Sequence, residues 1–392
     1  KMTPYKLRDY QQEASDRAVA FFKDSRIRYN AIEVLPTGSG KSLVIADIAS
    51  RLDGHTIVFQ PSKEILQQNF DKMCSYGVLD CSVYSASLNT KDINRITFAT
   101  IGSVMNHMDD FMHFDNIIID ECHLVSANGG QYEQFISTAK RKVLGLTATP
   151  YRLSSNSFGS MLKFLTRSRP RIFAKVIYHV QIDTLLRMGF LAELDYYYTP
   201  APHYEEGRLI SNSTGADYTD KSVINEYERV NFYSWLVSIT RRVMSPKNGR
   251  KRNGILVFTR FLKEAERLAS EIEGCAMVSG DTPPNERKEI LENFKAGRIR
   301  VVVNVGVLTT GFDYPELDTI IMARPTKSLS LWYQIVGRAI RPSPKKDKGW
   351  IVDLCGSLKR FGKVEDLRLV ETKPNLWQVQ SKGRQLTNII LQ

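Results

Sequence analysis

The strongest constraint on the fold is an alternation of short β-branched runs with stretches of helical period, which the chain passes through twice. In the first pass the runs are AIEVL (31–35), TIVFQ (56–60), ITFAT (96–100), IIID (117–120) and VLGLTAT (143–149). Stretches of helical period lie between them, for example over 41–51 and 63–75. This pattern is typical of a parallel sheet covered by helices.

The second pass repeats the pattern with different residues. Its runs are GILVFT (254–259), AMVSG (276–280), VVVNV (301–305), TIIMA (319–323) and WIVDL (350–354), and helices are expected near 261–273, 284–296 and 328–340. A chain of 392 residues is too long for one ordinary domain. The sequence therefore predicts two α/β domains in tandem, each a mainly parallel sheet with helices on both faces.

Loop-rich residues separate the two passes. The stretch 196–250 is at first aromatic, polar and loop-rich, is then expected to be helical up to Met244, and runs into the basic loop SPKNGRKRNG (245–254). We therefore expect a first domain over 1–195, a connector with a basic loop over 196–250 and a second domain over 251–365. Residues 366–392 are expected to form a C-terminal tail.

Cysteine usage and hydropathy bear on the compartment. The five cysteines are scattered, without a CxxC pair or a Cys/His cluster at metal-ligand spacing, which favours structural thiols in a reducing compartment. No apolar run is long enough to span a bilayer, and the N-terminal stretch lacks the apolar core of a secretory signal. We expect a cytoplasmic protein that does not enter a membrane.

Positive charge is concentrated in the second part of the chain. Residues 1–150 contain 16 Lys and Arg against 17 Asp and Glu, whereas residues 151–392 contain 38 against 25. The net charge of +12 therefore originates entirely beyond residue 150. A field of this kind attracts polyanions, nucleic acid first among them.

The segment LPTGSGKS (35–42) joins the first expected strand to the first expected helix. A glycine-containing turn at this junction aims backbone N–H groups and a helix N-terminus at one point, which binds phosphate. Lys41 would reach the β- and γ-phosphates of a nucleotide, and Ser42 would bind Mg²⁺. The predicted nucleotide-binding residues here are Thr37, Gly38, Ser39, Gly40, Lys41 and Ser42. The alternative is a glycine-rich turn without function.

The run IIIDECH ends in two carboxylates at the edge of the sheet where ligands of such folds bind. Asp120 suits a Mg²⁺ ligand, and Glu121 suits a base that positions water for attack on the γ-phosphate. Acid pairs also occur as simple caps at strand ends, but behind a phosphate loop the catalytic interpretation is favoured.

Together, these segments resemble the motifs of superfamily 2 helicases and translocases of the DExH/D class, here with the letters Asp-Glu-Cys-His at 120–123. In that family the phosphate loop commonly keeps only its later glycines, which accounts for Leu35 at the position of the first. LRDYQQEA (7–14) resembles the adenine-recognition motif, in which Arg8 and Gln11 would read the base. The resemblance implies two tandem RecA-like P-loop domains that use ATP and Mg²⁺.

Other segments resemble the family's strand-contacting and coupling motifs, in the family's order: QPSKEIL (60–66), FATIGS (98–103), LTATP (146–150), LVFTR (256–260) and VLTTGFDYPELD (307–318). The resemblance implies nucleic-acid contacts from Pro61, Ser62, Thr100, Arg260 and Thr310. It also implies nucleotide contacts from Gly311 and Asp313. Each of the strand-contacting residues has an alternative interpretation as an ordinary loop or capping residue.

The segment QIVGRAIRP (334–342) carries the predicted coupling of the two domains. Arg338 and Arg341 lie three residues apart on an expected helix, so both would project from one face. By resemblance they act as arginine fingers, with Gln334 near the γ-phosphate. Taken without the other motifs, two such arginines are more often a solvated helix face.

The leading functional hypothesis is an ATP-dependent DNA helicase or translocase, and the resemblance is strongest to RadD-like repair ATPases and restriction-type DNA helicases. DNA is favoured over RNA as the partner. The alternatives are an RNA helicase and a nucleotide-gated clamp that closes on nucleic acid without unwinding it. His123 is expected to relay to the second domain, and Trp332, Trp350 and Trp377 are expected to pack in cores rather than stack on bases. The sequence leaves the oligomeric state open, a monomer included.

Overall fold

The structure is a computed structural model that describes residues 5–126, 129–308 and 312–392. The chain divides into two compact units. Unit 1 comprises Lys1–Arg152, Leu162–Gln181 and Arg368–Gln380, and unit 2 comprises Leu153–Met161, Ile182–Leu367 and Ser381–Gln392. Within the described ranges, every helix is too short or too polar to cross a bilayer.

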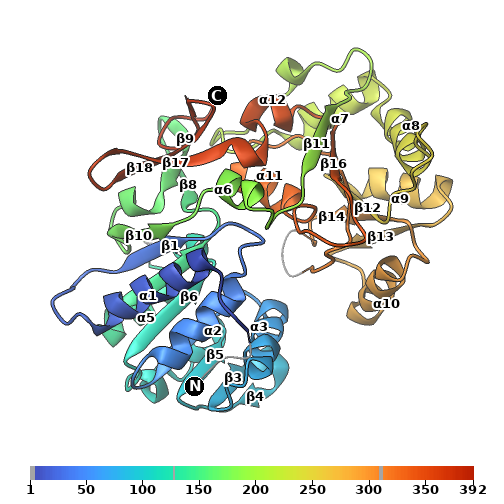
Figure 1. The fold of residues 1–392 in the computed structure, drawn as a ribbon. Coiled ribbons are helices and arrows are strands. Elements are labelled where there is room, and N and C mark those ends of the chain that lie inside the picture. Colours follow the sequence, from blue (N-terminus) through green and yellow to red (C-terminus); the bar gives the residue numbers. More distant parts are fainter. Residues whose placement is uncertain (1–4, 127–128, 309–311) are drawn as a thin grey trace. The chain divides into compact units, whose positions relative to one another are not determined.

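Unit 1 is built on an eight-stranded sheet in the order β10-β1-β7-β6-β2-β5-β3-β4 (Figure 1). Its strands are β1 (Ala31–Val34), β2 (Thr56–Phe59), β3 (Cys81–Ser85), β4 (Thr90–Lys91), β5 (Ile96–Ala99), β6 (Asn116–Asp120), β7 (Val143–Thr147) and β10 (Lys175–His179). All neighbouring pairs are parallel except β3 and β4. The residues of β1, β2, β5, β6 and β7 are buried throughout, as their continuous apolar runs predict.

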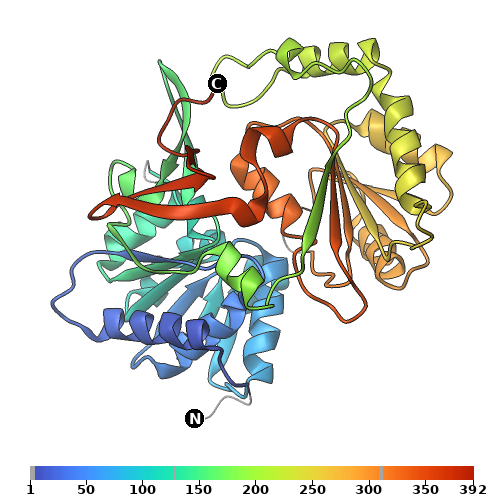
Figure 2. The same cartoon turned by 45° about the horizontal axis from the view of Figure 1, so that its top comes forward.

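Helices cover both faces of this sheet. The connections after β1 and β2 run one way along the strand order, and those after β5 and β6 run back. Because crossovers between parallel strands are right-handed, the two sets of helices lie on opposite faces. On one face α1 (Asp9–Lys23) contacts α2 (Lys41–Arg51), which contacts α3 (Lys63–Ser75), as Figures 1 and 2 show. The other face carries α4 (Ile101–Met105) and α5 (Gln131–Ala139), which contact each other.

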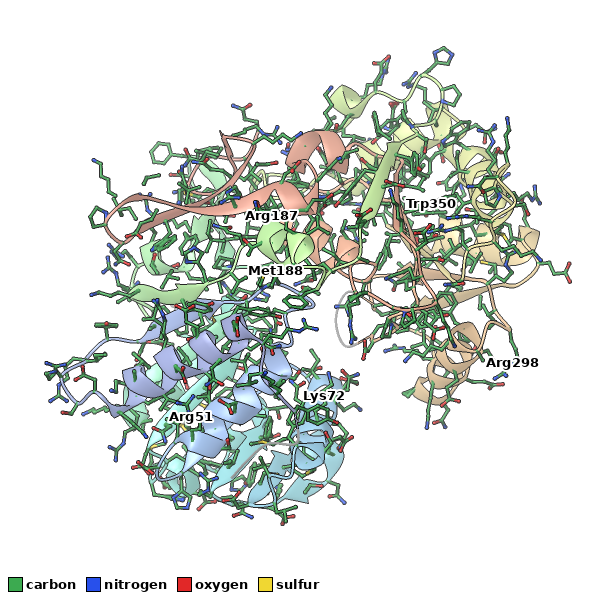
Figure 3. The ribbon with its side chains drawn as sticks, viewed as in Figure 1. Arg51, Lys72, Arg187, Met188, Arg298 and Trp350 are labelled. Carbon is green, nitrogen blue, oxygen red and sulfur yellow. The ribbon has the colours of Figure 1, made fainter. Side chains whose placement is uncertain are left out.

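Polar contacts supplement the packing of α1 on α2. Arg51, labelled in Figure 3, donates from Nη1 to Asp16 Oδ1 at 2.7 Å. The expected helices 41–51 and 63–75 coincide with α2 and α3. Ser62 precedes α3 and its Oγ accepts from the Ile65 N–H at 3.3 Å, which accounts for the start of that helix.

Unit 2 is built on a six-stranded parallel sheet in the order β11-β16-β15-β12-β14-β13. Its strands are β11 (Leu194–Tyr198), β12 (Ile255–Thr259), β13 (Cys275–Ser279), β14 (Val301–Val305), β15 (Thr319–Ala323) and β16 (Gly349–Asp353). The expected strands 301–305 and 319–323 coincide with β14 and β15.

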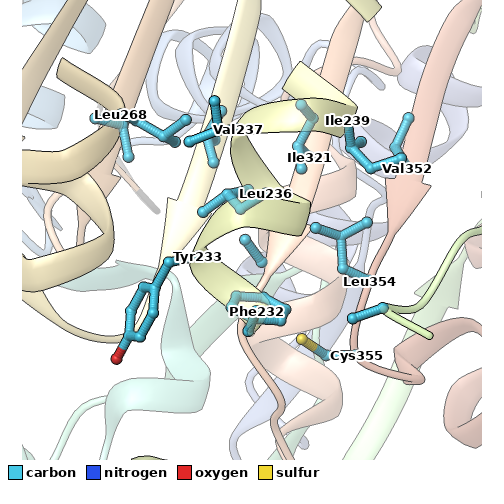
Figure 4. Close-up of a cluster of buried hydrophobic side chains, with 14 of the residues drawn as sticks. Phe232, Tyr233, Leu236, Val237, Ile239, Leu268, Ile321, Val352, Leu354 and Cys355 are labelled. Atoms are coloured by element: carbon cyan, nitrogen blue, oxygen red, sulfur yellow. The ribbon is translucent and has the colours of Figure 1, made fainter. Parts of the chain in front are cut away.

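An apolar helix fills one face of the second sheet (Figure 4). This helix, α8 (Phe232–Met244), ends at the expected residue and contacts α9 (Leu262–Glu271). Figure 4 shows its side chains against strand residues Ile321 and Val352. The opposite crossover direction places α10 (Pro284–Lys295) and α11 (Leu329–Val336) on the other face.

The segments predicted as a connector and a tail contain regular structure. Residues 196–250 contribute most of β11, together with α7 (Asp220–Arg229) and α8, to unit 2. Residues beyond 365 form a three-stranded sheet in the order β17-β18-β19, comprising Leu367–Lys373, Leu376–Ser381 and Arg384–Gln385. The remaining elements are β8 (Tyr151–Asn156), β9 (Gly159–Phe164), α6 (Ile182–Arg187) and α12 (Ser357–Phe361). β11 and β17 show few buried residues, so their sequences carry little hydrophobic pattern.

Tryptophans pack rather than project. Trp332 is fully buried, and Trp377 lies within 6.5 Å of Phe164 and 5.1 Å of His179, ring centroid to ring centroid. Trp350, labelled in Figure 3, is half-buried on β16, with the guanidinium carbon of Arg252 3.9 Å from its ring centroid. Core packing therefore accounts for Trp332 and Trp377, and a cation–π contact for Trp350.

Candidate active site

The phosphate loop lies between β1 and the N-terminus of α2 in unit 1. Gly38 and Gly40 have positive φ angles of 83° and 77°, so the turn needs residues without a Cβ. At Gly40 a Cβ would also come within 2.3 Å of Gln11 Nε2. Two glycines in this turn therefore allow the backbone to begin α2 at Lys41 with its N–H groups directed outward.

Residues of the expected adenine motif contact this loop from the start of α1. Tyr10 Oη donates to Ser39 O at 2.6 Å, and Gln11 Nε2 donates to the same oxygen at 2.8 Å. The Arg8 N–H donates to Gln11 Oε1 at 2.9 Å, while the Arg8 side chain is exposed. The structure thus brings Arg8 and Gln11 to the phosphate loop. Sequence reasoning missed Tyr10, although its place beside Gln11 in the motif was the available signal.

Two carboxylates lie against Lys41. Its Nζ is 2.7 Å from Asp120 Oδ1, at the end of β6, and also forms an ion pair with Glu121 Oε1. Burial alone lowers the pKa of Lys41, but the two adjacent carboxylates outweigh it and hold the pKa above its ordinary value. Lys41 is therefore charged at neutral pH, and it offsets part of the negative charge of the acid pair.

Glu121 is held in an unusual backbone conformation. Its φ of 53° is in the left-handed region, which a residue with a Cβ rarely adopts. The backbone turns there directly after the buried strand β6, and the Glu121 N–H donates to Asp120 Oδ1 at 2.9 Å. The turn directs the two successive carboxylates to one cation instead of to opposite sides of a strand.

A buried amide joins the predicted metal ligands. Ser42 Oγ donates to Asn69 Oδ1 at 2.8 Å, and Asn69 Nδ2 lies 3.4 Å from Asp120 Oδ2. Asn69 Nδ2 also donates to Gln60 Oε1 at 3.1 Å. A hydroxyl and a carboxylate are the oxygen donors that Mg²⁺ prefers, so this set fits the predicted ion. Sequence reasoning missed Asn69, which in the sequence is one more polar residue on α3.

His123 connects the acid pair to β7. Its Nδ1 is 2.9 Å from Thr147 Oγ1 and 3.3 Å from Glu121 Oε2. Thr147 Oγ1 also accepts from the Thr149 N–H at 3.0 Å. Burial lowers the pKa of His123, so the ring is neutral at pH 7. The side chain links IIIDECH to LTATP within unit 1, and a relay to the second domain stays a prediction.

Two predicted strand-contacting residues occupy equivalent places in unit 1. Ser62 caps α3 after β2, and Thr100 precedes α4 after β5, the parallel neighbour of β2. Thr100 Oγ1 is 2.8 Å from Ser103 Oγ. Pro61, Ser62 and Thr100 are half-buried at one edge of the sheet. Ser62 thus has a capping role, Thr100 has none, and the nucleic-acid role of these residues stays a prediction.

The predicted arginine fingers do not lie on a helix. α11 ends at Val336, and the turn of Gly337 and Arg338 follows. A glycine weakens the helix there, and Pro342 disfavours helical geometry at Arg341. Expecting both arginines on one helix face was therefore wrong. Gln334 lies on α11 and is half-buried.

Both arginines contact the segment after β14. Arg338 Nη1 donates to Phe312 O at 2.6 Å, and Arg341 forms an ion pair with Asp313, a predicted nucleotide contact. The structure thus brings Arg338, Arg341 and Asp313 together within unit 2. Thr310 and Gly311 lie outside the described residues.

Arg260 is engaged inside unit 2. Its guanidinium donates to Asp217, Asp220 and the Tyr218 carbonyl at distances of 2.8 to 3.3 Å, and its side chain is only 9% exposed. A nucleic-acid contact from Arg260 stays a prediction, and it requires these partners to be exchanged.

Two family models match the chain. Residues 4–152 match the model described as "Type III restriction enzyme, res subunit", and residues 235–343 match "Helicase conserved C-terminal domain". The Saccharomyces cerevisiae protein named "Putative ATP-dependent helicase IRC3" is 25% identical over 90% of this chain and 52% of its own length. The "DNA 3'-5' translocase XPB2" of Sulfurisphaera tokodaii is 24% identical over 87% of this chain and 79% of its own.

Solved structures share the fold. The restriction-modification enzyme LlaBIII bound to DNA has a TM-score of 0.66 and 20% identity, and the match covers 89% of this chain and 28% of that one. The tandem RecA-like expectation is confirmed at the level of fold. The chain spans between about half and two thirds of the length of the curated relatives that match it first. The chain thus contains a domain that matches the res subunit of type III restriction enzymes, followed by a domain that matches the conserved C-terminal domain of helicases.

Proposed function

We propose that this protein is an ATP-dependent DNA helicase or translocase that hydrolyses ATP with Mg²⁺. The observation that carries the proposal is the placement of Lys41, behind a phosphate loop and between the carboxylates of Asp120 and Glu121. Burial raises the pKa of Asp120, and the adjacent charge of Lys41 opposes that rise. This arrangement supports a nucleotide site, because a lysine behind a phosphate loop is placed to contact the phosphates of ATP.

ATP would reorganise these ion pairs. The β- and γ-phosphates compete with the two carboxylates for Lys41, so binding frees Glu121 to orient a water molecule toward the γ-phosphate. Ser42 and Asp120 would hold Mg²⁺, which when bound neutralises charge on the phosphates. Tyr10 and Gln11 fix the loop through Ser39 O, and Arg8 and Gln11 would contact the base.

The second unit would supply further positive charge. In this proposal Arg338 and Arg341 exchange Phe312 O and Asp313 for the phosphates, and Gln334 contacts the γ-phosphate region. Because only the triphosphate offers a γ-phosphate to these groups, hydrolysis would release them. ATP turnover would thereby be linked to movement of the strand-contacting loops.

DNA is the proposed substrate. Relatives named as a DNA translocase and as a restriction enzyme bound to DNA support this choice, as does the basic excess beyond residue 150. Hydroxyl and backbone groups at Ser62 and Thr100 would hold phosphates without reading sequence.

The test compares ATPase activity without nucleic acid and with single-stranded DNA, forked DNA and RNA. We expect DNA to stimulate hydrolysis and salt to reduce the stimulation, because phosphate contacts release counterions. Strand-displacement and translocation assays on the same DNA then separate unwinding from movement. ATP hydrolysis that is unaffected by DNA would contradict the proposal. Stimulation by RNA alone would identify RNA rather than DNA as the substrate. Stimulation by DNA without strand displacement or translocation would indicate a nucleotide-gated clamp.

A further inference from the structure

Four basic side chains gather at the carboxyl edge of the second sheet. Arg260 follows β12, Arg324 follows β15, Lys327 lies three residues beyond, and Arg360 lies on α12, which follows β16. These strands are neighbours in the order β16-β15-β12 and are parallel, so their carboxyl ends meet at one edge. That edge is where open parallel sheets bind their ligands.

Tyr218 lies at the centre of this basic cluster. Lys327 Nζ is 5.3 Å from the centroid of its ring, and Arg360 Nη2 donates to its hydroxyl at 2.7 Å. Arg260 donates to its carbonyl at 2.8 Å. One residue of the segment 205–220 thus contacts three of the four cations.

The same segment supplies the carboxylates that neutralise the cluster. Asp217 and Asp220 accept from Arg260, and Glu206 Oε1 is 3.6 Å from Arg360 Nε. The segment contains four acidic residues against the single basic Arg208. The carboxylates of this segment therefore contact the basic side chains at positions that the phosphates of a polyanion could also occupy.

Arg324 is the exception. Its Nε is buried without a hydrogen-bond partner, and its guanidinium forms no ion pair with any residue in the described part of the chain. Burial lowers the pKa of Arg324 and the like charge of Arg260 lowers it further, whereas the negative charge of Asp217 raises it. An arginine in such surroundings is costly unless an anion joins it.

The exposure of the ion pairs shows which partner can leave. The Arg260 side chain is 9% exposed, whereas those of Asp217 and Asp220 are 38% and 72% exposed. The arginine is therefore fixed in the unit, and the carboxylates form its solvent-facing side. A strand that arrives from solvent meets the carboxylates first.

We infer that Arg260, Arg324, Lys327 and Arg360 form a binding site for the phosphodiester backbone of nucleic acid, in which the exposed carboxylates of Asp217 and Asp220 occupy Arg260 until phosphates replace them, while Leu209 and Tyr218 keep the segment 205–220 anchored in the core. This inference rests on the proposed function and adds to it a site and its internal competitor. The phosphates take the places of the Asp217 and Asp220 carboxylates on Arg260, and a further phosphate joins Arg324. Nucleic-acid binding is thereby weakened by the free energy needed to displace these two carboxylates.

The first experiment removes the competitor. The double variant Asp217→Asn/Asp220→Asn keeps the shape of both side chains, and its affinity for a labelled single-stranded DNA is measured by fluorescence anisotropy at several salt concentrations. We expect the affinity to rise by about tenfold at physiological salt, which is one strong ion-pair exchange. The control Glu286→Gln/Glu289→Gln makes the same change of net charge on exposed positions of α10. An equal rise in the control would overturn the inference, because general charge would then explain the effect.

The second experiment removes the arginine without a partner. Arg324→Gln is expected to weaken DNA binding by about tenfold and to lower the salt slope by about one, as the loss of one phosphate contact does. Unchanged affinity and slope would contradict the site. Inorganic phosphate at equal ionic strength distinguishes a polynucleotide site from a site for a free anion. If inorganic phosphate displaced DNA more strongly than chloride does at the same ionic strength, the site would be one for a free anion and the inferred ligand would be wrong.

The parent protein separates this inference from the proposed function. If the parent neither binds DNA nor is stimulated by it, the proposed function fails. If the parent binds DNA and responds to it, while the double variant matches its control and Arg324→Gln matches the parent, only the inferred site fails.

Discussion

At the scale of single residues, the proposed nucleotide site depends on ion pairs among three groups. Asp120 and Glu121 hold the pKa of Lys41 above its ordinary value, and Lys41 in turn opposes the rise that burial causes in the pKa of Asp120. Replacing Lys41 with a neutral residue would leave the Asp120 and Glu121 carboxylates next to each other without a cation between them.

Lys41→Ala is expected to abolish ATP hydrolysis, with a fall of at least about a hundredfold in kcat. The loss removes the cation that lies between Asp120 and Glu121 and that we place on the phosphates. Steady-state ATPase assays with saturating DNA measure it. Lys72→Ala, at an exposed position on α3 (Figure 3), is the matched control and should hydrolyse ATP like the parent. Near-normal turnover in Lys41→Ala would remove the phosphate loop from the mechanism.

Asn69→Ala tests the buried amide between the predicted metal ligands. We expect ADP to bind the variant much like the parent without Mg²⁺, and Mg²⁺ to tighten ADP binding several-fold less, because Ser42 and Asp120 lose the group that spaces them. Calorimetry with and without Mg²⁺ measures this difference independently of turnover. Gln67→Ala, on the exposed side of α3, is the control. An unchanged effect of Mg²⁺ would show that Asn69 only packs.

The residues that the sequence predicted in this site are those whose roles are local. Lys41 and Ser42 begin a helix, and Asp120 and Glu121 end a strand, so their placement depends on a few neighbouring residues. Tyr10 and Asn69 belong to the site only because α1 and α3 pack beside α2. Such contacts join residues far apart in the sequence, so Gln11 was predicted only through the resemblance of LRDYQQEA to a family motif, and no local pattern marks Asn69.

At the scale of elements, buried strands were predictable and edge strands were not. β14 and β15 are continuous apolar runs because both of their faces are covered. β11, at an edge, reads LDYYY and has no residue in the fully buried class. α11 stopped short of Arg338 because Gly337 and Pro342 outweigh the helical period of the residues before them.

Gly145 on β7 shows how closely elements of unit 1 approach. A Cβ there would lie 2.6 Å from Cys122 Sγ and 3.0 Å from a ring carbon of Phe173, both of which are buried. Gly145→Ala is expected to lower the free energy of unfolding by about 1 to 3 kcal/mol through overpacking. It should also raise the KM for ATP, because Cys122 follows Glu121.

Chemical denaturation and ATPase kinetics measure both effects. The control is Gly280→Ala, where a Cβ would meet open space. If Gly145→Ala were as stable as this control, η3 (Cys122–Leu124) would be able to shift away from the added methyl group without lowering the free energy of unfolding.

Glu264 on α9 makes the stability of unit 2 depend on pH. Burial raises the pKa of this carboxyl from 4.5 to about 7, against the opposing effect of nearby backbone N–H groups. Between those pH values the folded chain keeps a proton that the unfolded chain has lost. The contribution of Glu264 to the free energy of unfolding therefore falls as the pH rises from about 4.5 through about 7, and it stays low above.

Glu264→Gln is expected to remove that fall and to raise the free energy of unfolding at pH 8 by up to about 3 kcal/mol. Urea denaturation at pH 5 and pH 8 measures the difference, and Glu266→Gln at an exposed position on the same helix is the control. A parent and variant with parallel pH profiles would show that the carboxyl is not protonated in the folded state.

At the scale of the whole molecule, the tandem arrangement could be predicted because the strand and helix pattern occurs twice. The composition of the units could not. Residues 368–380 belong to unit 1, where Trp377 packs with Phe164 and His179, although they follow the last strand of the second sheet. That packing depends on contacts across about two hundred residues, which no periodicity in the tail signals.

The proposed mechanism needs both units, so a change in unit 2 must affect hydrolysis without weakening nucleotide binding. Arg338→Ala is expected to bind ATP within about threefold of the parent and to lose about 10³-fold or more in kcat, because an arginine finger acts mainly in the transition state. Binding is measured with a fluorescent ATP analogue and turnover by phosphate release. Arg298→Ala, an exposed arginine bonded to Asn293 (Figure 3), is the control for a lost charge in the same unit.

The pattern of loss distinguishes a finger from a structural arginine. Arg338 donates to Phe312 O, so its removal also frees a carbonyl in unit 2, and a fall in stability alone would lower the amount of active protein without changing KM or kcat per folded molecule. Arg341→Ala should lose turnover in the same way and also release Asp313. If both variants lost ATP binding in proportion to turnover, the arginines would be ground-state ligands. If neither lost turnover, hydrolysis would belong to unit 1 alone, and no coupling through these arginines would exist.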